Sequence, residues 1–357
     1  MSSAQTTRRR APALAAAPLP ALVTVLLAMT GLSMVIAIGL GPVAISPATV
    51  ARVVVGHLSS APTIGGPDDF IVWQLRAPRV VQGIAVGAGL ALAGLLSQAV
   101  IRNPLGDPFI FGLSSGSSVG AVLTITTTGT LALGIFAVPS AAVVGAMFTA
   151  VIVFVLSGSA GAVVPGKLVM TGFAVGQFLA GLTSFLLLRT KQPDAQQQVL
   201  FWLLGSVAGA RWLLATLCAA VVAILCIVTA ALAGRLNLLV LGDDGAAALG
   251  INAGRTRVAL LGLITVLTGT VVAVSGIIGF VGLVIPNLAR LLVGADHRRS
   301  VPVSALLGAL LVVWSDTAAR LVLAPTELPI GILTAVIGVP FFLVILRRSS
   351  TGMVGLA

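Results

Sequence analysis

The stretch GRLNLLVLGDDGAAALGINAGRTR, residues 234–257, is a polar loop that lies between two long apolar runs. Its centre, residues 244–250, begins with aspartate and ends with glycine, the usual residues at the start and end of a short helix. A second aspartate, Asp243, and three arginines surround this centre. A short helix held in water beside apolar helices is suited to contact a soluble partner.

The composition of the whole chain restricts its class. Of the 357 residues, 58% are hydrophobic and only 8% are charged, whereas soluble domains carry about 25% charged residues. The chain is therefore predicted to be an integral membrane protein. A net charge of +11 could suggest nucleic-acid binding, but the charges lie between apolar runs, as membrane topology requires. No nucleic-acid partner is predicted.

Ten apolar runs, each near the roughly 20 residues that cross a bilayer as a helix, set the predicted architecture. They predict an all-α membrane protein with one ten-helix domain over residues 19–348, flanked by cytoplasmic tails at 1–18 and 349–357. The runs are 19–40, 80–101, 109–127, 131–156, 168–188, 212–233, 258–275, 276–293, 303–323 and 328–346.

The distribution of basic residues predicts the orientation. With the N-terminus inside, thirteen of the twenty Lys and Arg residues fall in inner segments and seven in outer ones. Cytoplasmic loops carry an excess of these residues. We therefore expect both termini and the 234–257 loop to face the cytoplasm, with lipid around the ten helices.

Sites for chemistry are hard to assemble from this sequence. Residues 161–167 match G-x-x-x-x-G-K, but Leu168 stands where a phosphate-binding loop needs Ser or Thr, and no strand precedes it. His57 and His297 are predicted on opposite sides of the membrane, and no Ser/His/Asp set is available. Cys218 and Cys226 are two helical turns apart, too far to bond, and are predicted to be packing residues. No catalytic residue, cofactor or metal site is predicted.

A few polar residues stand out within or beside the apolar runs. Asp316 and Arg320 are four residues apart and can pair on one helix face; whether that pair is structural or functional stays open. Arg76, Arg79 and Arg320 fall on the outer side, against the charge bias. They could dock an acidic partner, although the residues alone favour contact with lipid headgroups.

Two local patterns predict backbone features. Gly112, Gly116 and Gly120 are spaced by four, which favours close packing of another helix, or less often a helix that lines a pathway. Ser46 followed by Pro47 predicts the start of a short surface helix in the first outer loop.

Several blocks of sequence, in order along the chain, resemble the FecCD family of ABC-transporter permeases. These type II importers take up iron-siderophore complexes, haem and cobalamin, and the chain is similar to the vitamin B12 permeases among them. The matching blocks are LRAPR (75–79), RNPLGDP (102–108), LSSG (113–116), LGDDGAAALG (241–250), GFVGLVIPNLAR (279–290), DHR (296–298), ELPIG (327–331) and GVPF (338–341).

The resemblance implies a set of partners and their contact sites. It implies a second permease subunit, identical or related, a cytoplasmic ATPase dimer and an extracytoplasmic substrate-binding protein. The loop 234–257 would couple to the ATPase, through Asp243, Asp244, Ala247 and Gly250. The outer arginines Arg76, Arg79 and Arg320 would then receive acidic residues of the binding protein.

A gate and a pathway are implied in the same way. The turn at Val164 and Pro165 matches a cytoplasmic gate, although family members often carry small polar residues there. The run 168–188 would line the translocation pathway.

The predicted function is therefore that of a permease subunit in the bacterial cytoplasmic membrane. It would move an iron-siderophore complex, or a similar bulky chelate, by alternating access, without enzymatic chemistry of its own. Cobalamin or haem is the alternative substrate within the same fold. An ATPase-independent secondary transporter would need intramembrane acids or a proton relay, and an intramembrane enzyme would need paired catalytic groups; the sequence offers little for either.

Overall fold

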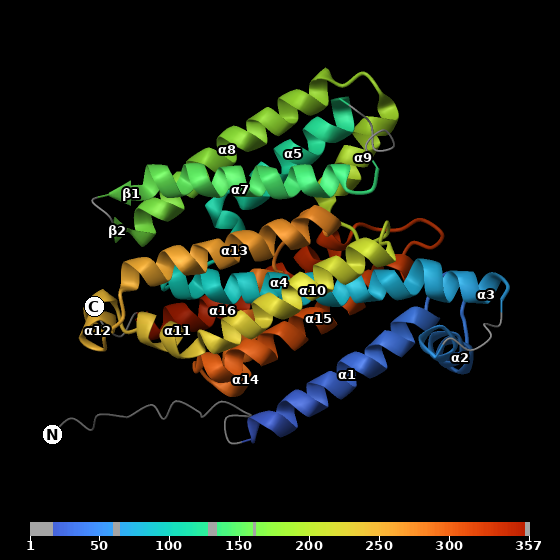
Figure 1. Ribbon diagram of the computed structural model, residues 1–357, viewed down its shortest axis with the longest axis horizontal. Helices are drawn as coiled ribbons and strands as arrows, with labels where there is room; N and C mark the ends of the chain where they lie inside the picture. Colours follow the sequence, from blue (N-terminus) through green and yellow to red (C-terminus); the bar gives the residue numbers. More distant parts are fainter. Residues whose placement is uncertain (1–16, 60–64, 128–133, 160–161, 354–357) are drawn as a thin grey trace.

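The computed structural model describes residues 17–59, 65–127, 134–159 and 162–353, which form an elongated bundle of helices (Figure 1). Most of the predicted tail 1–18, and the last residues of the tail 349–357, lie outside the described residues. The helices that correspond to the ten expected runs are α1 (Leu19–Gly39), α4 (Ala77–Ile101), α5 (Leu113–Thr127), α7 (Ala137–Ser157), α8 (Pro165–Arg189), α10 (Trp212–Ala231), α13 (Ala253–Ser275), α14 (Val281–Val293), α15 (His297–Leu321) and α16 (Ile330–Met353).

Short elements connect these helices. They are α2 (Pro47–Leu58), α3 (Pro67–Asp69), η1 (Phe70–Arg76), η2 (Pro108–Phe111), α9 (Pro193–Leu204), α11 (Ala233–Leu239) and α12 (Asp243–Ala248). A small hairpin pairs β1 (Gly158–Ser159) with β2 (Ala162–Val163) in antiparallel register. The expected surface helix is confirmed as α2, where the Ser46 hydroxyl accepts a hydrogen bond from the Thr49 N–H and Pro47 is the first helical residue.

Helix lengths confirm a membrane protein and correct several boundaries. Among the described residues, seven helices are long and apolar enough to cross a membrane. One of them runs without a break from Pro67 to Ile101, so the helix expected at 80–101 begins much earlier. By contrast α5 has 15 residues and α14 has 13. The predicted runs 258–275 and 276–293 follow each other directly, but α14 begins only at Val281.

The shorter helices α5 and α14 begin within the depth of the bundle. A Cβ built on Gly282, in the first turn of α14, would lie 2.9 Å from Pro108 Cδ and 3.1 Å from the carbonyl oxygen of Leu90, near the middle of α4. The chain therefore turns back into the bundle after α4. Non-helical backbone is tolerated at such depth where protein buries it, and here Asn287 Nδ2 donates to the Pro104 carbonyl at 2.8 Å.

Helix α4 forms the centre of the bundle. Within its most apolar window 83% of the residues are buried, compared with 22% in α8. Glycines allow its neighbours to approach: a Cβ on Gly87 would lie 2.1 Å from the Gly308 oxygen of α15. The predicted close packing at Gly116 and Gly120 is confirmed, because a Cβ on Gly120 would lie 2.1 Å from the Ala141 oxygen of α7.

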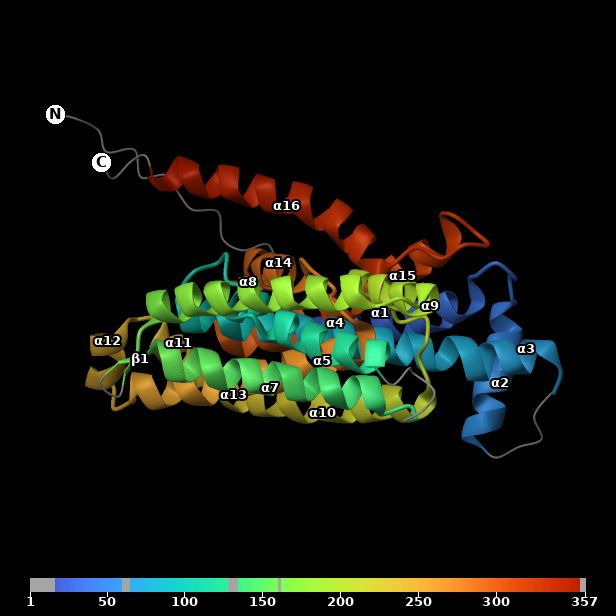
Figure 2. The same cartoon turned by 90° about the horizontal axis from the view of Figure 1, so that it is seen from above.

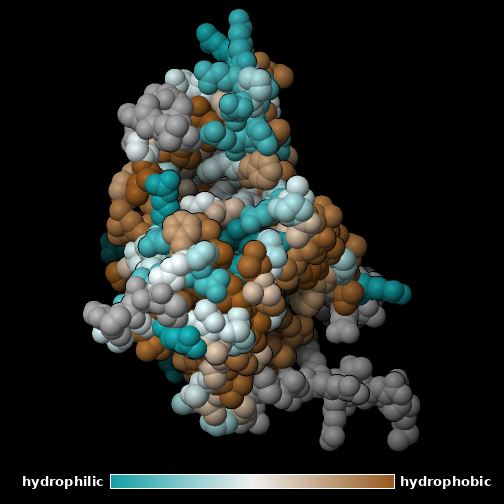
Figure 3. Space-filling view, turned by 90° about the vertical axis from the view of Figure 1, so that its right-hand side faces the viewer, coloured by the Kyte–Doolittle hydropathy of each residue, from teal (hydrophilic) through white to brown (hydrophobic). Residues whose placement is uncertain are grey.

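Apolar side chains cover the flanks of the bundle. Helix α8 exposes Met170, Phe173, Phe178 and Phe185, and α16 lies along one side of the molecule, apart from the main body over much of its length (Figure 2). Figure 3 looks at the end that carries α2 and α3, where hydrophilic side chains are interspersed and hydrophobic ones form the flank. This distribution fits a chain whose sides contact lipid or another apolar helix.

Candidate functional site

The residues singled out from the sequence gather at opposite ends of the bundle. One end of the bundle carries α11, α12 and the β1–β2 hairpin; it holds the predicted ATPase contact and is called the coupling end below. The opposite end carries α2 and α3 (Figure 1). Ala17, two residues before α1, also lies at the coupling end, because Arg299 Nη2 in the first turn of α15 donates to its carbonyl at 2.6 Å. Helices α4 and α15 run between the two ends.

At the coupling end, α12 confirms the short helix expected in the polar loop. Its C-terminal stop is as predicted, because Gly250 follows it with a φ of +80°, in the left-handed region that favours glycine. Its start differs from the expectation: Gly242 occupies the N-cap position, and no aspartate side chain caps the helix. The Asp243 carboxylate is engaged elsewhere, with Arg257.

Asp243 ties α12 to two membrane helices. Its Oδ2 accepts from Arg257 Nη1 at 2.8 Å, and its Oδ1 accepts from Arg257 Nη2. Arg102 Nη1 lies 3.5 Å from the same Oδ1. The hydrogen bonds from Arg257 hold the pKa of Asp243 below its usual range. Because Arg257 belongs to α13 and Arg102 follows the last residue of α4, one carboxylate links three helices.

The other residues predicted to contact the ATPase form an exposed surface beside Asp243. Asp244, Ala247 and Gly250 are all exposed, while Ala246 is buried against the body. Leu241 and Leu249 add exposed apolar side chains at the two ends of α12. The helix therefore presents one face to solvent and holds the other against the bundle, as expected for a contact with a soluble partner.

Asn237 of α11 makes a second link, to the start of α15. Its Oδ1 accepts from the backbone N–H of His297 at 2.9 Å and lies 2.7 Å from His297 Nδ1. Its Nδ2 donates to Asp296 Oδ1 at 2.7 Å, which lowers the pKa of Asp296. His297, whose role the sequence left open, thus joins the coupling end to α15.

The predicted gate residues lie at the same end of the bundle as α12 (Figure 1). Val164 follows the β1–β2 hairpin and precedes α8, and Pro165 is the first residue of that helix. Proline suits this position because the first helical residue needs no N–H partner. The Val164 side chain is exposed; a gating role for this turn stays a prediction.

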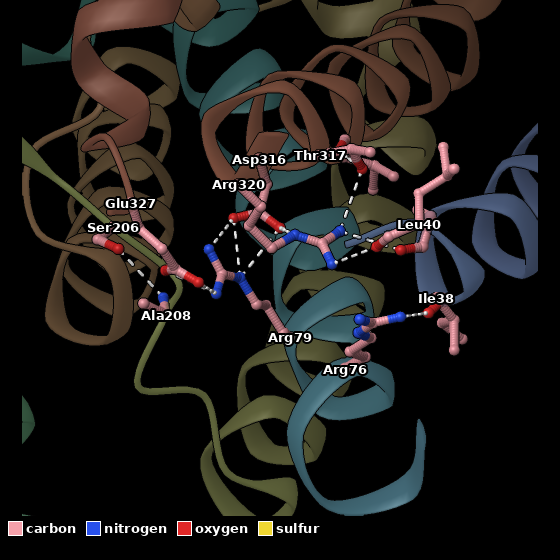
Figure 4. A network of polar contacts seen from close by, with 12 residues as sticks. Ile38, Leu40, Arg76, Arg79, Ser206, Ala208, Asp316, Thr317, Arg320 and Glu327 are labelled. Carbon is pink, nitrogen blue, oxygen red and sulfur yellow. Dashed lines mark hydrogen bonds and ion pairs between the residues drawn. The ribbon is translucent and has the colours of Figure 1, made fainter. Parts of the chain in front are cut away.

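At the opposite end, Arg79 is the centre of a buried charge network (Figure 4). Its Nε and Nη2 donate to Asp316 at 2.8–3.1 Å, and its Nη1 donates to both oxygens of Glu327 at 2.9 Å. The pair of Asp316 and Arg320, expected from their spacing, is confirmed with Arg320 Nε 3.2 Å from Asp316 Oδ2. The pairing of Arg79 with Glu327, from the segment between α15 and α16, was not anticipated.

Arg76 and Arg320 hold the C-terminal end of α1. Arg76 donates to the carbonyls of Ile38, Gly39 and Val43 at 2.6–3.0 Å. Arg320 donates to those of Ala37 and Leu40 at 2.9–3.0 Å. The last carbonyls of a helix lack partners within it, and cations there are favoured, which explains why these guanidinium groups point inward.

The outer arginines are therefore more buried than the sequence indicated. Arg76, Arg79 and Arg320 are 7%, 6% and 3% exposed, respectively. Side chains this buried do not reach lipid headgroups from their present positions. Docking of an acidic partner at these three residues stays a prediction, and it would have to engage groups that already have partners.

His57, in α2, belongs to a separate cluster of side chains at the same end of the bundle. Its Nε2 lies 3.2 Å from both carboxylate oxygens of Asp69, and its ring stacks on Trp73 with centroids 4.3 Å apart. Trp212 donates from Nε1 to the Trp73 carbonyl at 2.8 Å. The cluster joins α2 to η1 and α10, so His57 has a stacking partner in Trp73 and a hydrogen-bond partner in Asp69.

Comparison with known proteins agrees with this arrangement of helices. The model of the FecCD transport family matches residues 26–348, nearly the whole described chain. The chain belongs to the FecCD transport family. As a FecCD protein it is a multi-pass membrane permease of an ABC importer family.

Among FecCD relatives, the cobalamin import system permease protein of Halobacterium salinarum is 41% identical over 277 residues, covering 78% of this chain and 73% of that protein. An Fe(3+)-citrate import system permease protein of Bacillus subtilis is 39% identical, covering 80% of this chain and 83% of that one. A solved structure of an inward-facing metal-chelate type ABC transporter matches with a TM-score of 0.81 and 32% identity, covering 92% of this chain and 99% of the other.

The FecCD fold is confirmed by that structural match. Among residues 17–59, 65–127, 134–159 and 162–353, no group of three or more His, Cys, Asp or Glu side chains could hold a metal ion. The charged residues instead connect helices at the two ends of the bundle, which is an arrangement suited to transmitting movement.

Proposed function

We propose that this FecCD chain is the permease subunit of an ATP-driven importer that moves a ferric siderophore, or a similar bulky chelate, by alternating access. One observation supports this most directly: α4 is joined to the coupling helix at one end, through Arg102 and Asp243, and to α15 at the other, through Arg79 and Asp316. Helices held at both ends can carry a displacement across the membrane.

In the proposed mechanism, a cytoplasmic ATPase dimer contacts the exposed face of α12 at Asp244, Ala247 and Gly250. ATP binding and hydrolysis occur in those partner subunits. A displacement of α12 reaches α4 and α13 through Asp243, and a displacement of α11 reaches α15 through Asn237.

At the opposite end, an extracytoplasmic binding protein with acidic surface residues docks at the cluster of Arg76, Arg79 and Arg320. The cluster contains three guanidinium groups against two carboxylates, Asp316 and Glu327. Guanidinium groups pair with carboxylates, which supports an acidic partner.

A second permease subunit, identical or related, completes the pathway. The exposed apolar face of α8 and the separate position of α16 support a helical partner on this side (Figure 2). Helix α8 would line the pathway between the two subunits, and the turn at Val164 and Pro165 would gate its cytoplasmic end.

Cobalamin or haem is the second candidate substrate. The 41% identical relative is a cobalamin permease and another, 36% identical over 280 residues, is a hemin permease of Yersinia pestis. Iron chelates are the first candidate because the Fe(3+)-citrate relatives cover more of this chain, up to 88%.

Uptake measurements test the substrate proposal. A strain that lacks the gene is compared with a complemented strain for uptake of labelled ferric siderophores, ferric citrate, haem and cobalamin. We expect one iron chelate to depend on the gene, and we expect that uptake to stop when the ATPase partner is removed. If only the uptake of cobalamin or haem depended on the gene, that substrate would replace the iron chelate in the proposal. Uptake that continued without the ATPase partner would contradict the importer mechanism.

Replacing Asp243 with asparagine should uncouple the ATPase from the permease. The Asp243→Asn variant loses the charge that holds Arg257 and Arg102, so α12 is no longer fixed to α13 and α4. We expect stimulation of ATP hydrolysis by the loaded binding protein to fall on the order of tenfold, measured in proteoliposomes.

Asp194→Asn is the control for this experiment. Asp194 is an exposed acid in the first turn of α9, outside the proposed ATPase contact, and within the described part of the chain it forms no ion pair. Its substitution should change the stimulation of ATP hydrolysis by less than twofold, because substitutions at exposed sites usually have small effects. Equal effects of the two substitutions would contradict the transmitting role of Asp243.

A further inference from the structure

Every nitrogen of the Arg79 guanidinium group donates to a carboxylate in this structure. Its Nε and Nη2 face Asp316, and its Nη1 faces Glu327 (Figure 4). A guanidinium group offers its N–H donors in a fixed fork, and here one carboxylate takes the Nε–Nη2 edge and the other takes Nη1. An acid from another protein can make a bidentate contact with Arg79 only if one of the two carboxylates leaves.

The two carboxylates differ in how firmly they are held. The Asp316 side chain is 3% exposed, lies within α15 and also pairs with Arg320. The Glu327 side chain is 37% exposed and lies on the segment between α15 and α16, where residues 321–327 are all exposed. Within the described residues, Arg79 is the one ion-pair partner of Glu327. Glu327 is therefore the carboxylate that can be exchanged.

We propose that Glu327 is an internal competitor for the docking site: it occupies the Nη1 edge of Arg79 that a carboxylate of the binding protein would take, and docking proceeds by exchange of one for the other. This inference rests on the proposed docking function. Its physical basis is that both carboxylates would make the same bidentate contact, so the affinity of the partner is reduced by the stability of the internal pair.

The exchange would also change which helices hold the segment that carries Glu327. When Glu327 leaves Arg79, the segment 321–329 loses its ionic attachment to α4 and keeps its backbone contacts, Leu328 N–H to the Ala319 carbonyl and Ile330 N–H to the Gly205 carbonyl. The start of α16 would then be held by α9 and α15 and no longer by α4. Release of Glu327 is thus a local change that differs between the free and the docked permease.

The test measures the affinity of the permease–ATPase complex, in nanodiscs, for its own binding protein. Glu327→Gln keeps the side-chain shape and removes the competing charge, so we expect Kd to fall on the order of tenfold. Glu327→Asp keeps the charge on a shorter side chain, and its Kd should lie between those of Glu327→Gln and the wild type.

Two controls separate exchange from simple removal of negative charge. Asp194→Asn removes an exposed acid in the first turn of α9, with no ion pair among the described residues, and should leave Kd within about twofold. Arg79→Lys retains the positive charge but loses the bidentate fork. It should weaken docking in the wild-type background and cancel the gain of Glu327→Gln in the double variant.

The outcomes distinguish this inference from the docking proposal beneath it. If Arg79→Lys weakens docking but Glu327→Gln does not strengthen it more than Asp194→Asn does, Glu327 is a structural link and the inference is wrong. If Arg79→Lys also leaves Kd unchanged, docking at the arginine cluster itself is wrong. A lower melting temperature of Glu327→Gln together with unchanged Kd likewise contradicts the competitor role. The melting temperature and Kd of Glu327→Asp give the same comparison in a variant that keeps the negative charge.

Discussion

Replacing Gly94 with alanine is expected to prevent the bundle from assembling correctly. A Cβ at this position would lie 1.9 Å from the carbonyl oxygen of Gly282 and 2.4 Å from its Cα. The obstacle is the backbone of α14, which cannot rotate away as a side chain can. Helices α4 and α14 would have to separate, and α4 is the centre of the bundle. We expect a loss of about 3 kcal/mol or more.

Gly181→Ala is the matched control, because Gly181 is also a glycine within a long helix and a Cβ there meets nothing within 4 Å. Both variants are purified in the same detergent and compared by size exclusion and by thermal unfolding. The Gly94→Ala protein should aggregate or melt far below the wild type, and the Gly181→Ala protein should match or exceed it, because alanine favours the helix. A Gly94→Ala protein that melts with its control would show that α14 does not approach α4 as described.

Replacing Asp316 with asparagine is expected to be the most damaging charge substitution at the end of the bundle that carries α2 and α3. Asp316 is 2% exposed and faces both Arg79 and Arg320. Asparagine keeps the shape but removes the negative charge and turns N–H donors toward two cations. Loss of one partner from a buried ion pair costs about 3–5 kcal/mol, because the remaining charge is left without compensation.

Thermal unfolding in detergent measures this effect, with Asp194→Asn as the exposed comparison. That control should stay within about 0.5 kcal/mol of the wild type. A second variant, Asp316→Glu, restores the charge but not the fit, and it should recover part of the loss. If the Asp316→Asn and Asp194→Asn proteins had the same melting temperature, the arginine network would not contribute to folding.

The network of Arg76, Arg79 and Arg320 also explains why this chain carries arginine where membrane topology disfavours it. Arg76 and Arg320 supply donors to carbonyls at the end of α1 that no helix can satisfy internally. Their contribution is structural in the free permease, whatever partner docks there. The proposed exchange at Arg79 requires only Glu327 to move, so docking and capping can be performed by neighbouring residues of one network.

Several features of this protein follow from its sequence alone. The apolar runs, a short helix within the 234–257 loop with its glycine stop at Gly250, and the ability of Asp316 to pair with Arg320 were predicted, and the structure confirms them. Each depends on residues within a few positions of one another. Hydrophobic run length, helix caps and i,i+4 spacing act locally, so a single sequence reveals them.

Only the tertiary structure shows what the buried charges contact. Arg79 meets Asp316 across 237 positions of sequence, and Arg76 meets the end of α1 across 37 and 38. The return of the chain into the bundle before α5, and the late start of α14, likewise depend on which helices become neighbours. Neighbouring helices are brought together by close backbone approach at glycines such as Gly87 and Gly94. Neither the hydropathy of the sequence nor the spacing of its glycines predicts which two helices will meet at such a position.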